Sequence, residues 1–339
     1  MPLSYSPSTA PRTPLPPGVT REFINSPQGP LELLSAIPSS SKNKTPLFFN
    51  HGGFGCAAVW LEWMTFLSAV PHNIPCYALS YRGHGASWKP GYLRMTFGTT
   101  KRMLADDIVT GVKHVESLLR QQGNPGTKVV LVAHSNGGGL CQLALNDGDI
   151  QVKALALIDA TPPFGLLGVY INWFRADPWF PIRIYWHLFH ARSPLSSTAL
   201  VKNAFFCDEY PIEKIPALEK LMAPYESMLW PSSMFWRFIS IRKVLGNVNV
   251  AVGRPSVLVM AAEKSRLMDP AMMRRAADEY AMGIRDVLLE EDKEVSASQV
   301  AQTVSYELIR GAGHHLQNDL QWRDGAEKMA KFYKETTAA

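Results

Sequence analysis

The sequence predicts an α/β protein with a mostly parallel central sheet flanked by helices and with an inserted, mainly helical subdomain. Short apolar, β-branched runs alternate with longer helical stretches, which is the order expected of βαβ units. This alternation stops between residues 161 and 252, where prolines and large aromatic residues gather. A chain of 339 residues with 46% hydrophobic content is long and apolar enough for one such domain with an insertion.

The predicted elements follow in chain order. Residues 1–18 are rich in Pro, Ser and Thr and lack the apolar centre of a secretory signal, so we interpret them as a flexible leader. Two strands around Pro27–Pro30 form a hairpin. Later strands such as 128–133 are continuous apolar runs, typical of strands covered on both faces. The predicted strands are 22–26, 31–37, 46–50, 74–81, 128–133, 152–158, 256–261 and 304–309, and the predicted helices include 59–70, 99–122 and 322–333.

The insertion divides the chain into a core of residues 19–160 and 253–339 and a lid or cap of residues 161–252. Its aromatic residues predict a small second core, with part of them left to line a cavity. A shorter insertion is predicted at 285–302, where the acidic run Glu290-Glu291-Asp292 favours a solvated helix or loop.

The strongest motif is Ala133-His134-Ser135-Asn136-Gly137-Gly138-Gly139, which directly follows a predicted strand and precedes a helical stretch. A serine on such a sharp strand-to-helix turn projects its hydroxyl above the sheet. The following backbone N–H and the helix N-terminus are then placed to stabilise an oxyanion. The motif therefore predicts Ser135 as a nucleophile.

With this motif the chain resembles the α/β-hydrolase family from about residue 22 to residue 333, although Ala133 stands where the family usually has glycine. The segment His51-Gly52-Gly53-Phe54-Gly55 strengthens the resemblance, and so does Arg82-Gly83-His84-Gly85-Ala86-Ser87, to which we assign no chemistry. The resemblance implies that the N–H groups of Gly53 and Asn136 form the oxyanion hole. It implies a structural role for His51.

The general base is expected in Gly311-Ala312-Gly313-His314-His315, which follows the last predicted strand. A histidine within hydrogen-bond reach of the serine removes its proton and returns it to the leaving group. By resemblance to the family this residue is His314, while His315 is expected to be a pocket or supporting side chain.

The acid of the triad has two candidates, because Ser265 stands where the family often has an aspartate after the strand ending near residue 261. Asp159 lies 24 residues after Ser135, a position that resembles the acid of some lipases and zearalenone-type lactonases. Glu263 lies two positions before Ser265. We favour Asp159, with Glu263 as the alternative and Asp269 as a remoter one.

An activated serine with an oxyanion hole performs acyl transfer, which predicts a serine hydrolase acting on an ester, lactone or thioester through an acyl-enzyme. The aromatic insertion predicts a lid and hence a bulky, apolar substrate. Resemblance to stand-alone fungal hydrolases suggests a polyketide or other natural product. C–C bond cleavage, lyase or cyclase chemistry, and ligand binding without turnover remain alternatives on this fold.

Other partners are not expected. The formal charge of +5 is small and scattered, so it predicts no nucleic-acid surface. The apolar stretch from 154 to 174 contains Asp159 and two prolines, so it predicts no transmembrane segment. We expect no cofactor and no metal, since His187 and His190 lack a third ligand nearby. The four cysteines are widely spaced without a CxxC pair, which favours a cytosolic protein with reduced thiols.

Overall fold

The computed structural model describes residues 3–7, 12–41, 44–251, 253–290 and 296–338. Its centre is one eight-stranded sheet in the order β1-β2-β4-β3-β5-β6-β7-β8. The pairs β1–β2 and β2–β4 are antiparallel and the other five are parallel, so the predicted α/β class with a mostly parallel sheet is confirmed. The strands are β1 Val19–Ser26, β2 Gly29–Ala36, β3 Leu47–Asn50, β4 Cys76–Leu79, β5 Val130–Ser135, β6 Ala154–Ala160, β7 Val257–Ala262 and β8 Val304–Ile309.

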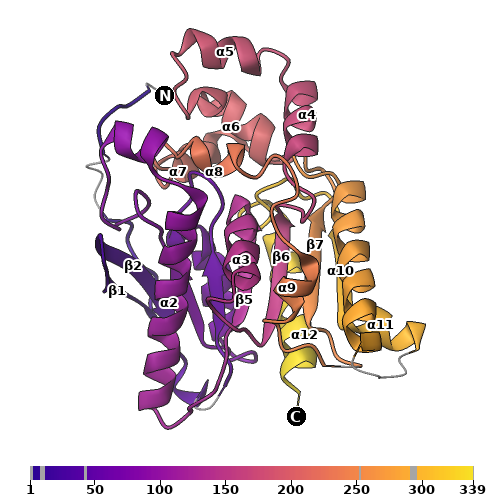
Figure 1. The fold of residues 1–339 in the computed structure, drawn as a ribbon. Coiled ribbons are helices and arrows are strands. Elements are labelled where there is room, and N and C mark those ends of the chain that lie inside the picture. Colours follow the sequence, from indigo (N-terminus) through magenta and orange to yellow (C-terminus); the bar gives the residue numbers. More distant parts are fainter. Residues whose placement is uncertain (1–2, 8–11, 42–43, 252, 291–295, 339) are drawn as a thin grey trace.

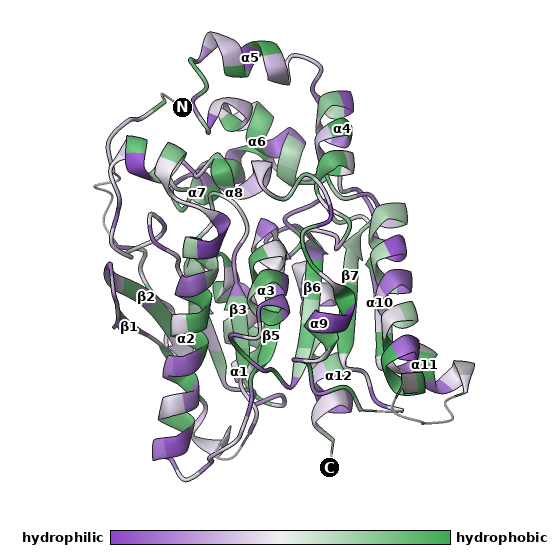
Figure 2. Ribbon diagram, in the orientation of Figure 1, coloured by the Kyte–Doolittle hydropathy of each residue, from purple (hydrophilic) through white to green (hydrophobic). Residues whose placement is uncertain are grey.

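Helices cover both faces of the sheet (Figure 1). One face carries α2 (Lys101–Gln121), α3 (Asn136–Asn146), α9 (Ile241–Leu245) and α10 (Pro270–Glu290), and the other carries α1 (Leu61–Ser68) and α12 (Trp322–Thr337). Figure 2 shows the central strands as largely apolar, while α2 alternates apolar and polar residues. This pattern follows from burial, because β3, β4, β6 and β7 are buried at every position.

Helix boundaries agree with local chemistry where caps are present. Thr100 caps α2 by accepting the N–H of Met103 at 3.3 Å. The cap lies one residue after the start of the predicted helix, 99–122. The short insertion predicted at 285–302 begins too early, because residues 285–290 belong to helix α10, which ends at Glu290. Glu291 and Asp292 lie outside the described residues, and α11 (Ala297–Thr303) follows them.

The chain between β6 and β7 leaves the sheet and forms short helices above the carboxyl ends of the strands (Figure 1). These are α4 (Leu167–Ala176), α5 (Phe180–Trp186), α6 (Thr198–Phe205), α7 (Ile215–Glu219) and α8 (Leu229–Ser232), followed by α9 on the sheet face. The insertion is thus mainly helical, as the sequence predicts.

The described parts of the leader, residues 3–7 and 12–18, contact the insertion and strand β1. The ring of Tyr5 lies 4.9 Å from that of His190, and Arg21 donates to the carbonyl of Thr13 at 2.7 Å. Residues 1–2 and 8–11 of the leader lie outside the described residues.

Candidate active site

Ser135 ends β5 in a conformation that side chains rarely adopt, with φ at 51° and ψ at −135°. The helix α3 begins at the next residue, so the chain turns sharply at the serine. The turn brings the backbone of Gly137 against the loop after β3, where a Cβ atom on Gly137 would collide with the carbonyl oxygen of His51. Glycine is therefore required at 137 for this close approach.

The structure brings Ser135, His314 and Asp159 together in one chain of hydrogen bonds. The distance from Ser135 Oγ to His314 Nε2 is 2.9 Å, and the distance from His314 Nδ1 to Asp159 Oδ2 is 2.6 Å. A carboxylate only accepts, so Nδ1 carries the proton and Nε2 is free to accept from the serine hydroxyl. This is the tautomer in which an imidazole acts as a base toward serine.

Asp159 sits at an irregularity of β6, where the pairing register with β5 shifts between His134 and Ser135. Its φ is 40°, and its side chain is fully buried. Burial raises the pKa of the Asp159 carboxyl, and the hydrogen bonds from His314, from the Ser265 hydroxyl and from the N–H of Ala262 oppose that rise. Ser265, which occupies the place of the family's usual aspartate, thus supports the carboxylate of Asp159.

The alternative acids point elsewhere. Glu263 accepts the N–H of Gly311 at 2.8 Å and ties the ends of β7 and β8. Asp269 accepts the N–H of Met272 at 2.9 Å at the start of α10 and a bond from Asn172 at 2.8 Å. Of the acids weighed from the sequence, Asp159 is the one bonded to His314.

Two further histidines pack around His314. The rings of His134 and His314 lie 4.8 Å apart, and Nε2 of His134 donates to the carbonyl of His314 at 2.9 Å. Burial, followed by the proximity of His314, lowers the pKa of His134 well below its usual range and that of His315 to about 3. Both rings are therefore neutral at physiological pH and act as packing and hydrogen-bonding groups.

The His314 loop is anchored to the insertion through Asp319. This buried carboxylate accepts the N–H of Gly313 at 2.7 Å and the N–H of Cys207 at 2.9 Å. In return, the N–H of His315 donates to the carbonyl of Phe205 at 2.7 Å. The base is therefore held by the end of α6 as well as by the sheet.

His51 has a structural set of partners. Its Nδ1 contacts the carbonyl of Gly52 at 2.8 Å, and its Nε2 accepts the N–H of Tyr81 at 3.2 Å. The ring lies 4.0 Å from that of Tyr81, so it joins the ends of β3 and β4.

Glu226 is a site residue that the sequence analysis missed. It belongs to the insertion, yet its Oε2 accepts the N–H of Phe54 at 2.9 Å, next to Gly53. The same oxygen lies 2.8 Å from Nε2 of His84, whose Nδ1 contacts the carbonyl of Arg82 at 2.9 Å. His84 and Glu226 thus form a buried hydrogen-bonded pair. No motif links residues 142 positions apart in the chain.

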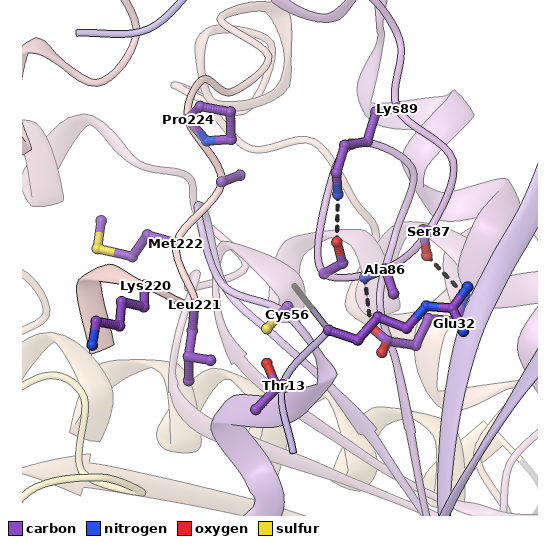
Figure 3. A pocket seen from close by; sticks show the side chains of 14 residues that line it. Thr13, Glu32, Cys56, Ala86, Ser87, Lys89, Lys220, Leu221, Met222 and Pro224 are labelled. Atoms are coloured by element: carbon purple, nitrogen blue, oxygen red, sulfur yellow. Dashed lines mark hydrogen bonds between the residues drawn. The ribbon is translucent and has the colours of Figure 1, made fainter. Parts of the chain in front are cut away.

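A cavity of about 220 Å³ lies between the insertion and the strand ends. Gly53 and Asn136 line it from the core, and Glu226 lines it from the insertion. The remaining walls are largely aromatic, with the Tyr170 and Phe235 rings 4.8 Å apart. A second, more polar hollow of similar size lies between Arg12, Glu32, Lys89 and Lys220 (Figure 3). Ser135, His314 and Asp159 line neither hollow. The apolar cavity is the one assigned to the candidate site, because Gly53 and Asn136, which flank the serine turn, line it.

The histidines weighed as metal ligands have protein partners. Nδ1 of His187 lies 2.9 Å from the Ser193 hydroxyl. Nε2 of His190 lies 3.0 Å from the Ser4 carbonyl, and its Nδ1 accepts the N–H of Arg192. Within the described part of the chain, no helix has the length and apolar character needed to cross a membrane.

Comparison with known proteins shows the family to which the chain belongs. The sequence model of the alpha/beta hydrolase family matches residues 47–323, and the chain belongs to this family, which confirms the resemblance drawn from its motifs. No curated protein sequence matches the chain.

Solved structures share the fold at low identity. A thermophilic esterase from Thermogutta terrifontis is 18% identical with a TM-score of 0.60, and the alignment covers 94% of this chain and 99% of that one. The enol-lactonase from Burkholderia xenovorans is 14% identical with a TM-score of 0.59, covering 93% and 100%. These likenesses support the fold.

Proposed function

We propose that this protein is a serine hydrolase that cleaves an ester, lactone or thioester of an apolar substrate through an acyl-enzyme. The observation that carries the proposal is the hydrogen-bonded chain from Ser135 through His314 to Asp159 at 2.9 and 2.6 Å. An imidazole held in this tautomer by a buried carboxylate is suited to deprotonate a serine hydroxyl.

In the proposed reaction, Ser135 Oγ attacks the substrate carbonyl while His314 Nε2 takes its proton. The N–H groups of Gly53 and Asn136 stabilise the oxyanion, and the N–H of Asn136 is available because the first N–H groups of a helix have no intrahelical acceptor. His314 then gives its proton to the leaving oxygen or sulfur. Water, deprotonated by His314, releases the acid and restores Ser135.

The role of a lid is proposed for residues 161–252. Support comes from the aromatic cavity walls contributed by this segment and from its bonds to the loops of His314 and Gly53. A cavity of about 220 Å³ is smaller than the 300–1,000 Å³ of common ligand sites. A bulky substrate, such as a polyketide, therefore requires lid side chains to move.

A cytosolic location is part of the same proposal. The four cysteines are free and buried, as suits a reducing compartment.

The experiment is labelling with a fluorophosphonate together with hydrolysis of p-nitrophenyl esters by folded variants. We expect wild type to label and Ser135→Ala not to label. Asp159→Asn should lower kcat by about 10³–10⁴-fold, because the histidine loses its orienting acceptor. Glu263→Gln is the matched control and should stay near wild type. A folded wild type that labels but hydrolyses no ester would move the proposal to C–C bond cleavage.

A further inference from the structure

The outward side of α5 and the turn after it form an unusual exposed surface, which we call the α5 apex. Every exposed residue from 178 to 189 is apolar or aromatic, and all residues of this stretch are described. The apex is formed by Trp179 (67% exposed), Ile182 (59%), Tyr185 (72%), Trp186 (81%), Leu188 (80%) and Phe189 (50%).

The size of this surface sets it apart from ordinary scattered apolar residues. A large aromatic side chain covers about 150–250 Å². Four such rings and two aliphatic side chains, each half exposed or more, present on the order of 800 Å², while the largest apolar patch of a typical monomer is about 300–600 Å². Patches above that size mark interaction surfaces.

The candidate substrate cavity does not account for the apex. The cavity is lined by the opposite side of α5, through Phe180 and Ile184. The helix is therefore apolar on both sides, one facing the cavity and the other facing solvent. Leu188 and Phe189 follow with φ of 50° and 61°, a region that costs about 1–3 kcal/mol for such residues. The backbone thus holds two apolar side chains outward in a disfavoured conformation.

The charged residues near the apex in the sequence are compatible with binding to a lipid surface. Asp177 is the one acidic residue from 161 to 207, all of which are described. Its carboxylate is buried and paired with Arg183 at 2.6 Å. Arg175 is exposed at the end of α4, and residues 161–207 present no exposed acidic group that would repel anionic head groups.

We propose that the α5 apex is a peripheral lipid-binding surface that inserts its side chains into the interfacial region of a membrane. Tryptophan and tyrosine favour that region because they combine an apolar ring with one polar group. The apex stands at the far end of the insertion from the sheet (Figure 1), where a bilayer can approach it.

A second copy of this chain fits the apex less well. Helix α5 has seven residues and is about 10 Å long. Two such helices packed together would cover only the side chains that face each other, whereas a standard interface takes about 800 Å² from each partner. A bilayer needs no such complementary shape.

The proposal is independent of catalysis and is tested by co-sedimentation with vesicles of phosphatidylcholine, alone or mixed with phosphatidylglycerol. The apex variant combines Tyr185→Ser, Trp186→Ser and Leu188→Ser. The matched control combines Val70→Ser, Met282→Ser and Leu289→Ser, which are 82%, 57% and 52% exposed on the core. We expect wild type and control to bind both vesicles and the apex variant to partition at least tenfold more weakly, with all three keeping the same thermal midpoint.

Acyl-chain-brominated phosphatidylcholine gives a second readout. It should quench wild-type tryptophan fluorescence, and Trp186→Phe should bind equally but lose part of that quenching. Wild type that stays off both vesicles, or an apex variant that binds as wild type does, would overturn the proposal. If wild type is instead a dimer in solution and the apex variant is a monomer, the apex is an interface with a second copy and the proposal also fails.

Discussion

Asp159 is held by three groups, His314, Ser265 and the N–H of Ala262, and Ser265 offers a sensitive test of the site. The Ser265 hydroxyl helps to keep the pKa of the buried Asp159 carboxyl from rising further. A carboxyl in this place must be ionised to orient His314 and to stabilise its cation. The pH at which activity fails on acidification therefore depends on this bond.

Ser265→Ala should shift the acid limb of the kcat/KM profile upward by about 1 pH unit, since a bond to a charged group is worth about 1.5–3 kcal/mol. The sign follows because loss of the bond raises the pKa of Asp159, so protonation occurs at higher pH. Ser265→Thr keeps the hydroxyl and should keep the wild-type profile. An unchanged profile in Ser265→Ala would mean that Asp159 does not govern the acid limb.

Glu226 tests the positioning of the oxyanion loop. Glu226→Gln replaces the carboxylate acceptor of the Phe54 N–H with an amide, so the anchor of the loop carrying Gly53 is weakened. We expect kcat to fall about tenfold with little change in KM, because an oxyanion hole acts in the transition state.

The control for this variant is Glu219→Gln, another buried glutamate of the insertion, which lies 3.3 Å from the Thr198 hydroxyl. Steady-state kinetics of both variants decide the question. A raised KM with unchanged kcat in Glu226→Gln would instead indicate contact with the substrate.

At the scale of elements, the helices of the insertion set the size of the cavity. Trp173 of α4 stacks on Phe180 of α5 with ring centres 5.3 Å apart, and both line the cavity. Trp173→Ala should therefore enlarge the site and raise kcat/KM for long-chain esters relative to acetate by about tenfold, since each buried methylene is worth about 0.8 kcal/mol. Chain-length profiles of p-nitrophenyl esters give the measurement.

Trp236→Ala is the matched control, because Trp236 is in the same insertion, is 71% exposed and does not line the cavity. Equal profiles for the two variants would show that the cavity is not where the acyl chain binds.

At the scale of the whole molecule, the core is reinforced below the site by a buried ion pair. Arg82 bonds both oxygens of Asp107 at 2.9 and 2.6 Å, with side chains 4% and 1% exposed. Arg82→Met leaves that carboxylate without its partner and should lower the free energy of unfolding by about 3–5 kcal/mol. Arg102→Met, which breaks the exposed pairs of Arg102, should cost no more than about 1 kcal/mol in denaturant unfolding. Equal losses would contradict the assignment of a structural ion pair to Arg82.

Sequence patterns predicted what depends on local chemistry. Buried strands appear as apolar runs, and the serine turn is a contiguous motif, so both were visible. The helix α10 was missed although Met273, Ala277, Tyr280, Ile284 and Leu288 are buried at helical spacing. The helical spacing of these apolar residues was present in the sequence, but many charged residues lie between them.

What the sequence left open depends on contacts between distant segments. The choice between Asp159 and Glu263 depends on which strand end faces His314, and Glu226 reaches Phe54 across 172 positions. The lid boundaries, the oxyanion roles and the catalytic roles of the triad remain predictions.

The most direct test of the central claim is to treat the protein with a fluorophosphonate and locate the adduct by peptide mass spectrometry. We expect one stoichiometric adduct on Ser135, absent in Ser135→Ala and strongly slowed in Asp159→Asn. A folded wild type with no adduct, or an adduct on another serine that survives Ser135→Ala, would contradict it.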